Sequence, residues 1–389
     1  MRLHSMLKRA LPALLALCLG LGLFALAACG KTETPQSDTP NSTEPVTPAP
    51  TTKTVTDAYG RSVVVPMEVT RVATVGSGAR LVVYAGAIDK LVAVTDMETK
   101  PAPTRPYAMA YADTFATLPS TSNGNHLNET EVDAEALLAL APDVIISSRS
   151  AAECDALQAQ SGIPVIGVSY QDDLFGDTIK ASIRCTAAAC GTETAGEELI
   201  SAIEGWEADI AARLAKATAT DATVYAAGLN FKGSKGFTGT SADYPVFAIL
   251  GLDNVAAQSG NTSNFDTTVE QILAWDPDYM FVNMANLTKL QADIDTAPGA
   301  FAMMTAFKTG NLYSQPSFTY NGTNTELGIA DVYWTASVMY PDAFGDCATP
   351  EFLDTIISAF LHTSYINQLS EQGLGFYQVD EWATLANAA

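Results

Sequence analysis

The amino-acid sequence predicts an α/β protein with two lobes, each with a central mostly parallel sheet flanked by helices, bridged by a single long α-helix. Short apolar strands alternate with helical segments through most of the 389 residues, which is typical of parallel sheets covered by helices. One phrase occurs twice, as AEALLALAPDVII at 134–146 and as VEQILAWDPDYMF at 269–281. Between the two copies, residues 192–217 have the apolar periodicity of one long helix. Two similar lobes joined by a helix account for all three observations.

The long helix is predicted by one apolar stripe. At 1.5 Å per residue, 192–217 would span roughly 39 Å. Thr194 and Glu197 fit a capping box at its start. We expect a single helix of this kind to resist large hinge closure between the lobes. The stripe is formed by Leu199, Ile203, Trp206, Ile210 and Leu214.

The repeated phrase predicts a helix followed by a strand in each lobe. Glu135 precedes Pro142-Asp143 by the same count as Glu270 precedes Pro277-Asp278. Proline stops the helix, and the residues after it have strand composition. The two acids therefore occupy equivalent places on equivalent helices.

The remaining elements follow the same alternation. In the N-terminal lobe, 54–171, we expect a hairpin at 54–66, strands at 71–75, 91–95, 143–147 and 164–169, helices at 79–87, 133–140 and 151–161, and a loop at 97–128. Residues 172–219 hold the connecting helices. In the C-terminal lobe, 220–389, we expect strands at 223–229, 279–283 and 312–315 and helices at 244–250, 268–275, 325–339 and 351–362.

The N-terminus predicts export. Basic residues precede an apolar run at 11–28, as in a signal peptide, and the run ends in Leu-Ala-Ala-Cys at Cys29. This resembles the lipobox of bacterial lipoproteins, in which the cysteine is lipidated after cleavage. We therefore expect residues 1–28 to be removed, Cys29 to anchor an extracytoplasmic protein to the cell membrane, and 29–53 to be a flexible tether. A plain membrane anchor is the alternative, although the run is marginal for spanning.

Charge and motifs exclude several functions. The net charge is −23, and it becomes −26 without residues 1–28, which hold three basic and no acidic residues. Such a negative charge argues against nucleic acid or an anionic membrane surface as a direct partner. We therefore expect the protein to contact the membrane through its lipid anchor only. The sequence contains no GxSxG, GxxxxGK[ST] or HExxH motif. We therefore expect no enzyme, although a carboxylate pair acting on a glycan stays open.

Cysteines and histidines indicate no metal centre. The spacing of Cys154, Cys185, Cys190 and Cys347 is not that of a metal site, and their pairing stays open. If Cys185 and Cys190 shared one intact helix, their Cα atoms would lie too far apart for a disulfide. Beyond the signal peptide the only histidines are His126 and His362, too few for a free-metal receptor. We expect no cofactor; an alternative is that His126 reaches a metal centre such as haem iron.

The hairpin and first strands resemble a known family. The passage at 56–96 holds an Asp, a Gly-Arg, a valine strand, a Pro, an Arg-Val strand, and a helix ending in Gly and Asp-Lys-Leu-Val. It is similar to the opening of periplasmic binding proteins for iron-siderophore, haem and cobalamin, the substrate-binding components of ABC importers. Pro-Asp-Val-Ile-Ile at 142–146 matches the same family. The resemblance implies two lobes joined by one long helix, a small-molecule metal chelate as ligand, and an expected monomer.

The resemblance also implies roles for residues. Glu135 and Glu270 match the glutamates that dock onto arginines of the ABC transporter permease.

Ligands of open α/β sheets bind beyond the carboxyl ends of the strands. At these ends the chain has arginines suited to chelate oxygens and tyrosines suited to flat rings. Gly76-Ser77-Gly78 lacks the third glycine of a dinucleotide site, so close packing explains it. The predicted ligand-binding residues are Arg80, Arg105, Tyr107, Arg149, Tyr170, Asn230, Asn283 and Tyr320.

An iron complex of the ferric siderophore type is the expected ligand. Cobalamin and haem stay open, because receptors for all three share this architecture. An exported enzyme and a sensor or adhesin on the same fold are the further alternatives.

Overall fold

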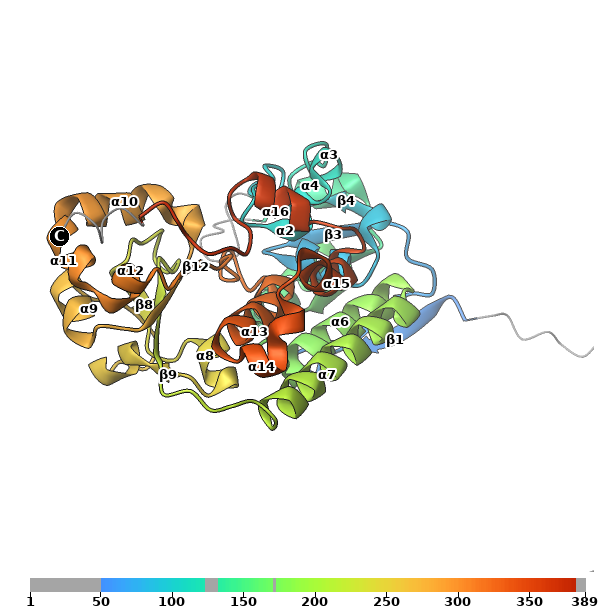
Figure 1. Ribbon diagram of the computed structural model, residues 1–389. Helices are drawn as coiled ribbons and strands as arrows, with labels where there is room; N and C mark the ends of the chain where they lie inside the picture. Colours follow the sequence, from blue (N-terminus) through green and yellow to red (C-terminus); the bar gives the residue numbers. More distant parts are fainter. Residues whose placement is uncertain (1–49, 123–131, 171–172, 383–389) are drawn as a thin grey trace, which may run out of the picture. The chain divides into compact units, whose positions relative to one another are not determined.

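The computed structural model describes residues 50–122, 132–170 and 173–382, and within them no helix is long and apolar enough to cross a membrane. The predicted signal peptide, Cys29, most of the tether and His126 lie outside the described residues. The arrangement of strands and helices in Figure 1 confirms the predicted α/β class, with two parallel sheets flanked by helices.

The N-terminal lobe is centred on a four-stranded parallel sheet of order β4-β3-β5-β6. Alternate residues of its strands join two different apolar clusters, as expected for strands buried on both faces. Val144 and Ile146 pack with α1 and α6, whereas Ile145 packs with α4 and α5. The strands are β3 (Val72–Val75), β4 (Leu91–Ala93), β5 (Val144–Ser147) and β6 (Val165–Gly167), and the helices are α1 (Gly78–Tyr84), α4 (Ala134–Leu140), α5 (Ala151–Ser161) and α6 (Asp177–Cys190).

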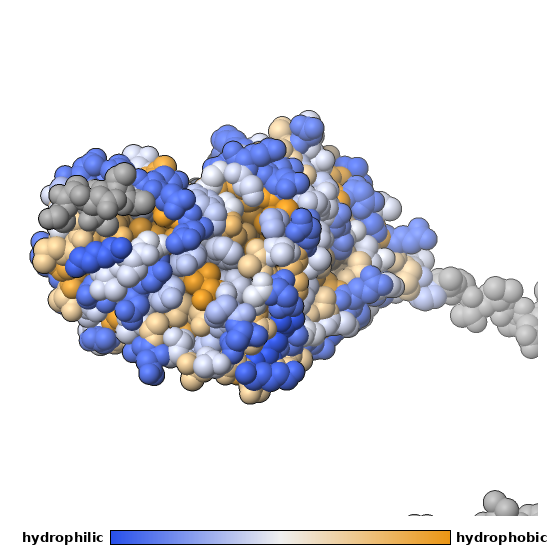
Figure 2. Space-filling model, in the orientation of Figure 1, coloured by the Kyte–Doolittle hydropathy of each residue, from blue (hydrophilic) through white to orange (hydrophobic). Residues whose placement is uncertain are grey.

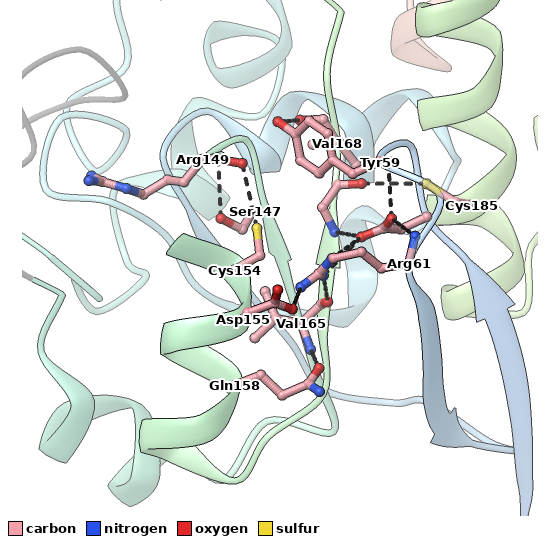
Figure 3. Close-up of polar contacts among 12 residues, drawn as sticks. Tyr59, Arg61, Ser147, Arg149, Cys154, Asp155, Gln158, Val165, Val168 and Cys185 are labelled. Atoms are coloured by element: carbon pink, nitrogen blue, oxygen red, sulfur yellow. Dashed lines mark hydrogen bonds and ion pairs between the residues drawn. The ribbon is translucent and has the colours of Figure 1, made fainter. Parts of the chain in front are cut away.

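The predicted hairpin is present and is fastened to the edge strand β6 (Figure 3). It consists of β1 (Thr52–Thr56) and β2 (Ser62–Pro66), so it begins two residues inside the expected tether. The buried carboxylate of Asp57 accepts hydrogen bonds from Arg61 Nε at 2.9 Å and from the Gly167 backbone N–H at 2.9 Å. Gly167 has to be glycine, because a Cβ there would lie 2.5 Å from the Tyr59 ring.

The C-terminal lobe is centred on a second parallel sheet, of order β12-β11-β7-β9. A short antiparallel pair, β8 and β10, which the sequence pattern did not reveal, lies in the same lobe. The strands are β7 (Thr223–Ala227), β8 (Gly239–Ser241), β9 (Asp253–Asn254), β10 (Asn264–Asp266), β11 (Tyr279–Val282) and β12 (Leu312–Ser314).

The two copies of the repeated phrase form the same structure. α4 leads into β5, and α9 (Val269–Trp275) leads into β11. Each helix ends on a left-handed residue with φ of 45°, Ala141 in one copy and Asp276 in the other. Asp143 then accepts a hydrogen bond from the Arg71 backbone N–H at 2.9 Å, and Asp278 accepts one from the Thr223 N–H at 2.8 Å. The aspartate after each proline thus ties its strand to the start of the neighbouring strand.

The long helix is α7 (Glu193–Leu214), 22 residues that lie beside α6 in Figure 1. It is shorter at both ends than expected, and the predicted capping box is wrong. Thr192, not Thr194, is the N-cap, and its side chain makes no capping hydrogen bond. The C-terminal end of α7 is tied to the last helices, because Arg213 donates to Asp346 Oδ1 at 2.7 Å.

The C-terminal helices pack against the N-terminal lobe. α13 (Thr325–Met339) is buried along nearly its whole length, and its apolar residues join the same cluster as α1, α6, α7 and one face of the second sheet. Gly328 allows close approach, since a Cβ there would lie 2.4 Å from a methyl group of Leu174. The same cluster receives α15 (Pro350–Leu361) and α16 (Ile366–Glu371).

The remaining helices are short and were mostly missed by the sequence pattern. The expected loop at 97–128 holds two of them, α2 (Pro106–Met109) and α3 (Ala112–Phe115). The other short helices are α8 (Pro245–Leu250), α10 (Leu287–Thr296), α11 (Pro298–Met303), α12 (Thr305–Thr309) and α14 (Pro341–Phe344).

The described cysteines are all free and buried. Cys185 and Cys190 both lie on α6, too far apart for a disulfide.

Candidate functional site

A cavity of about 540 Å³ lies at the carboxyl ends of the strands of the second sheet. Ala227 ends β7, Asn283 follows β11 and Gln315 follows β12, as expected for a ligand site of an open parallel sheet. The segment 173–175 and Glu207 of α7 complete the wall. Residues that come before the second lobe therefore contribute to the cavity.

The cavity wall combines aromatic rings and buried neutral polar groups with three exposed carboxylates, those of Asp173, Glu207 and Asp243. Phe175, Tyr244, Phe281 and Phe318 supply the rings. Burial raises the pKa of Tyr244 well above its ordinary value. The Tyr244 hydroxyl donates to Gln315 Oε1 at 3.1 Å. The buried part of the wall is therefore preorganised for a ligand that is apolar in part and hydrogen-bonds through neutral groups.

Two of the predicted ligand-binding residues line the cavity. The Asn230 amide donates to Ser317 Oγ at 3.1 Å and accepts from Asn286 at 2.9 Å. Asn283 donates to the Gly228 carbonyl at 2.9 Å. Both side chains are thus fixed by protein partners at the end of a strand.

A second group of predicted residues gathers around Arg80, which is fully buried on α1. Its guanidinium donates to Tyr170 Oη at 2.7 Å and lies 4.5 Å from the centre of the Tyr107 ring. It also donates to the carbonyl oxygens of Tyr320 and Asn321 at 3.3 and 3.2 Å. Among the described residues, none of Arg80, Tyr107, Tyr170 and Tyr320 lines the cavity.

This buried group, which we call the Arg80 cluster, holds a loop in place. It comprises Arg80, Tyr107, Tyr170 and the 320–324 loop. Arg80 also donates to Asn324 Oδ1 at 3.1 Å, and a Cβ on Gly322 would lie 2.6 Å from the Arg80 guanidinium. Residues 316–319, which line the cavity, directly precede this loop. The Arg80 cluster therefore fixes the loop that directly follows these lining residues.

Carboxyl groups border the Arg80 cluster without forming ion pairs to it. Tyr107 donates to Glu98 Oε1 at 2.7 Å, and Tyr84 donates to Glu326. Burial raises the pKa of Glu98 to about 7, despite the hydrogen bond from Tyr107 and the nearby charge of Arg105. Burial also raises the pKa of Glu326. Glu98, which borders the Arg80 cluster, is therefore partly protonated near neutral pH.

The other two predicted arginines bind protein groups away from the cavity. Arg105 is 2% exposed and donates to the carbonyl oxygens of Met97, at 2.6 Å, and Lys100. Arg149 pairs with Glu153, one turn along in α5, and borders a separate hollow of about 350 Å³. Figure 3 shows the Arg149 side chain pointing away from the Arg61 contacts.

The two predicted docking acids are exposed in equivalent first turns. Glu135 lies on α4 and Glu270 on α9. The pKa of the Glu270 carboxyl is lowered by hydrogen bonds from the Glu270 backbone and from Thr268.

On the face shown in Figure 2, hydrophilic residues predominate and apolar residues are scattered among them.

Several cavity residues were not predicted. Tyr244 precedes a helix, and Ser317 and Phe318 follow the short strand β12, so all three stand near strand or helix ends. Their position in the sequence was the available signal, but the direction in which each side chain points depends on packing.

Among the described residues there is no group of three or more His, Cys, Asp or Glu side chains that could hold a metal ion directly.

Comparison with solved structures shows the same fold. A periplasmic solute binding protein from Veillonella parvula has a TM-score of 0.64 at 22% sequence identity, over 83% of this chain and 96% of that one. The molybdate periplasmic binding protein MolA of Haemophilus influenzae has a TM-score of 0.60 at 21% identity, over 80% and 99%. The TroA-like periplasmic binding protein FepB from Veillonella parvula has a TM-score of 0.61 at 20% identity, over 80% and 97%.

The sequence itself matches a family model. The model described as "Periplasmic binding protein" matches residues 72–318, which include both parallel sheets. Comparison with curated proteins gives no match. Members of this family are extracytoplasmic solute-binding proteins, not enzymes, and they work with ABC permeases. The chain belongs to the periplasmic binding protein family.

Proposed function

We propose that the protein captures a metal chelate of the ferric siderophore type in the 540 Å³ cavity and delivers it to the permease of an ABC importer. The observation that supports this most is the cavity itself, which lies where solutes bind in open α/β folds and has a wall of rings, amides and hydroxyls. Its volume is in the range of about 300–1,000 Å³ that suits a small organic molecule. A chelate presents both apolar surface and oxygen atoms to such a wall.

A bare oxyanion fits less well. The neighbour MolA is named for molybdate, but no Lys, Arg or His is among the described residues that line this cavity. A small dianion would meet carboxylates there instead of compensating positive charge. An organic chelate is therefore the better candidate.

The predicted ligand-binding residues divide into three groups in this proposal. Asn230 and Asn283 contact the solute directly from the cavity wall. Arg80, Tyr107, Tyr170 and Tyr320 act through the Arg80 cluster. Arg105 and Arg149 stay predictions with no support from their position.

Delivery in this proposal uses the twin acids. Glu135 and Glu270 contact arginines of the permease, one from each lobe, and fix the orientation of the bound protein. Their exposure on equivalent helices supports this role. Lipidation at Cys29 holds a monomeric protein at the extracytoplasmic face of the membrane, with no cofactor and no catalytic activity of its own.

Calorimetric titration of the apo protein tests the proposed function. We expect a ferric siderophore to bind with one-to-one stoichiometry, and haemin and cyanocobalamin to bind more weakly. Ala248, which is exposed at the cavity, provides a blocking variant, Ala248→Phe, and Ala211→Phe on the exposed face of α7 is the matched control. Loss of binding only in Ala248→Phe supports the cavity as the site. Tight binding of haemin or cyanocobalamin alone contradicts the siderophore assignment.

A further inference from the structure

The charge of the cavity points to a narrower class of solute, an inference that rests on the proposed function. Asp173, Glu207 and Asp243 line the cavity, and none of the described lining residues is basic. We propose that the cavity selects chelates that are cationic or neutral, such as ferric hydroxamates, and excludes strongly anionic chelates, such as ferric catecholates.

The three carboxylates are not neutralised by the protein. All three are exposed, and none takes part in an ion pair within the described residues. Asp243 accepts a hydrogen bond from the Ser241 hydroxyl at 2.8 Å, and Asp173 accepts one from the Phe175 backbone N–H at 3.3 Å. Neither donor carries a full charge, so the negative potential extends into the cavity and persists over about 10 Å at 0.1 M salt.

Nearby basic side chains do not line the cavity. Arg80 is fully buried in the Arg80 cluster. Lys235 pairs with Asp266 at 2.8 Å. Lys232 follows Asn230 in the chain, but it is exposed and does not line the cavity. An anionic ligand would therefore find no partner charge in the wall.

The inner wall suits neutral chelate oxygens. Asn283, Gln315 and Ser317 line it with amide and hydroxyl groups and are each less than a tenth exposed. Each of the three already donates one hydrogen bond to a protein acceptor. The amides of Asn283 and Gln315 each have a second N–H, which can donate to a neutral acceptor. Hydroxamates balance the charge of Fe(III) and leave a neutral complex, to which a pendant ammonium group adds positive charge. Catecholates carry more negative charge than the iron neutralises, so their complex would be repelled by the three carboxylates.

Titration with three ferric chelates tests this inference. The probes are ferrioxamine B, which is cationic, ferrichrome, which is neutral, and ferric enterobactin, which is anionic. We expect ferrioxamine B to bind and its affinity to fall about tenfold between low salt and 0.5 M salt. Ferrichrome is expected to show no salt dependence, and ferric enterobactin is expected not to bind.

Charge-removing variants locate the effect in the cavity. The double variant Glu207→Gln, Asp243→Asn should weaken ferrioxamine B binding about fivefold at low salt and leave ferrichrome binding unchanged. Glu198→Gln, on an exposed position of the same helix as Glu207, is the matched control and should change neither. Binding of ferric enterobactin as tight as that of ferrioxamine B overturns the charge selection and leaves the proposed function standing. Binding of none of the three overturns both.

Discussion

At the residue scale, one arginine holds two acids in very different surroundings. Arg61 contacts Asp57, whose side chain is 0% exposed, at 2.8 Å. It also contacts Asp155, whose side chain is 68% exposed, at 2.7 Å (Figure 3). Asp57 also accepts hydrogen bonds from the backbone N–H groups of Tyr59 and Gly167. The buried acid therefore orders the whole turn, whereas the exposed acid only adds a surface pair.

The two acids should differ strongly in their effect on stability. Asp57→Ala leaves buried N–H groups without acceptors and should lower the free energy of unfolding by about 3 kcal/mol. Asp155→Ala should lower it by less than about 1 kcal/mol. Urea unfolding followed by circular dichroism measures both, and equal losses would contradict the role assigned to Asp57.

The buried Glu98 should make stability depend on pH. Its pKa rises from an ordinary value of 4.5 to about 7 on folding because it is buried. Its folded-state pKa lies above its unfolded-state pKa, so its contribution is fully present below pH 4.5 and is lost as the pH rises through 7. The loss is roughly 3 kcal/mol. Glu98→Gln should flatten this part of the profile in urea unfolding at several pH values, and an unchanged profile would exclude Glu98 as its source.

At the element scale, alanine substitutions at two glycines of α7 should have opposite effects on stability. A Cβ at Gly205 meets nothing within 4 Å, whereas one at Gly196 would lie 2.6 Å from Ala187 Cβ on α6. Gly205→Ala should therefore stabilise the protein by about 0.5–1 kcal/mol. Gly196→Ala should destabilise it by about 1–3 kcal/mol, because the two helices are forced apart. Thermal unfolding measures both, and equal signs would contradict the packing of α6 on α7.

The elements whose bounds the sequence predicted best were not those with the clearest apolar stripe, since α13 is buried on nearly all sides. The bounds of α5 and α13 agree with the expected 151–161 and 325–339, and the repeated phrase gave both helix–strand units. The pair of β8 and β10 was missed, because strands of three residues carry little periodic signal. Helices α10 to α12 were also missed, although α10, with ten residues, is longer than the predicted α4 and α9. That α13 is buried all round depends on the packing of distant segments, which no local pattern contains.

The candidate site was predicted only in part, because tertiary packing decided which of the predicted residues reach the cavity. Asn230 and Asn283 follow parallel strands, so the rule about carboxyl ends placed them at the cavity. The same rule placed Arg80 and Tyr170 at the ligand, but the 320–324 loop returns over them and buries both. Where a loop crosses another lobe is decided by tertiary packing, so the sequence alone did not separate the two groups.

At the scale of the whole molecule, the twin acids should control transport and not binding. Reversing both charges, Glu135→Lys with Glu270→Lys, should abolish uptake in cells because the permease arginines would be repelled. Chelate affinity of the purified variant should stay unchanged, since both acids lie outside the cavity lining. The control with the same change in net charge is Glu198→Lys with Glu371→Lys, at two other exposed positions. Normal uptake by the first variant would contradict the docking role.

The location of the bound metal tests the central claim most directly. A crystal structure of the protein with a ferric hydroxamate, with data collected at the iron absorption edge, gives the iron position independently of the ligand density. We predict a single anomalous peak inside the cavity bordered by Tyr244, Asn283 and Phe318, with the Arg80 cluster intact behind it. An iron peak among Arg80, Tyr107 and Tyr170 with the 320–324 loop displaced, or one outside the cavity, would contradict the account.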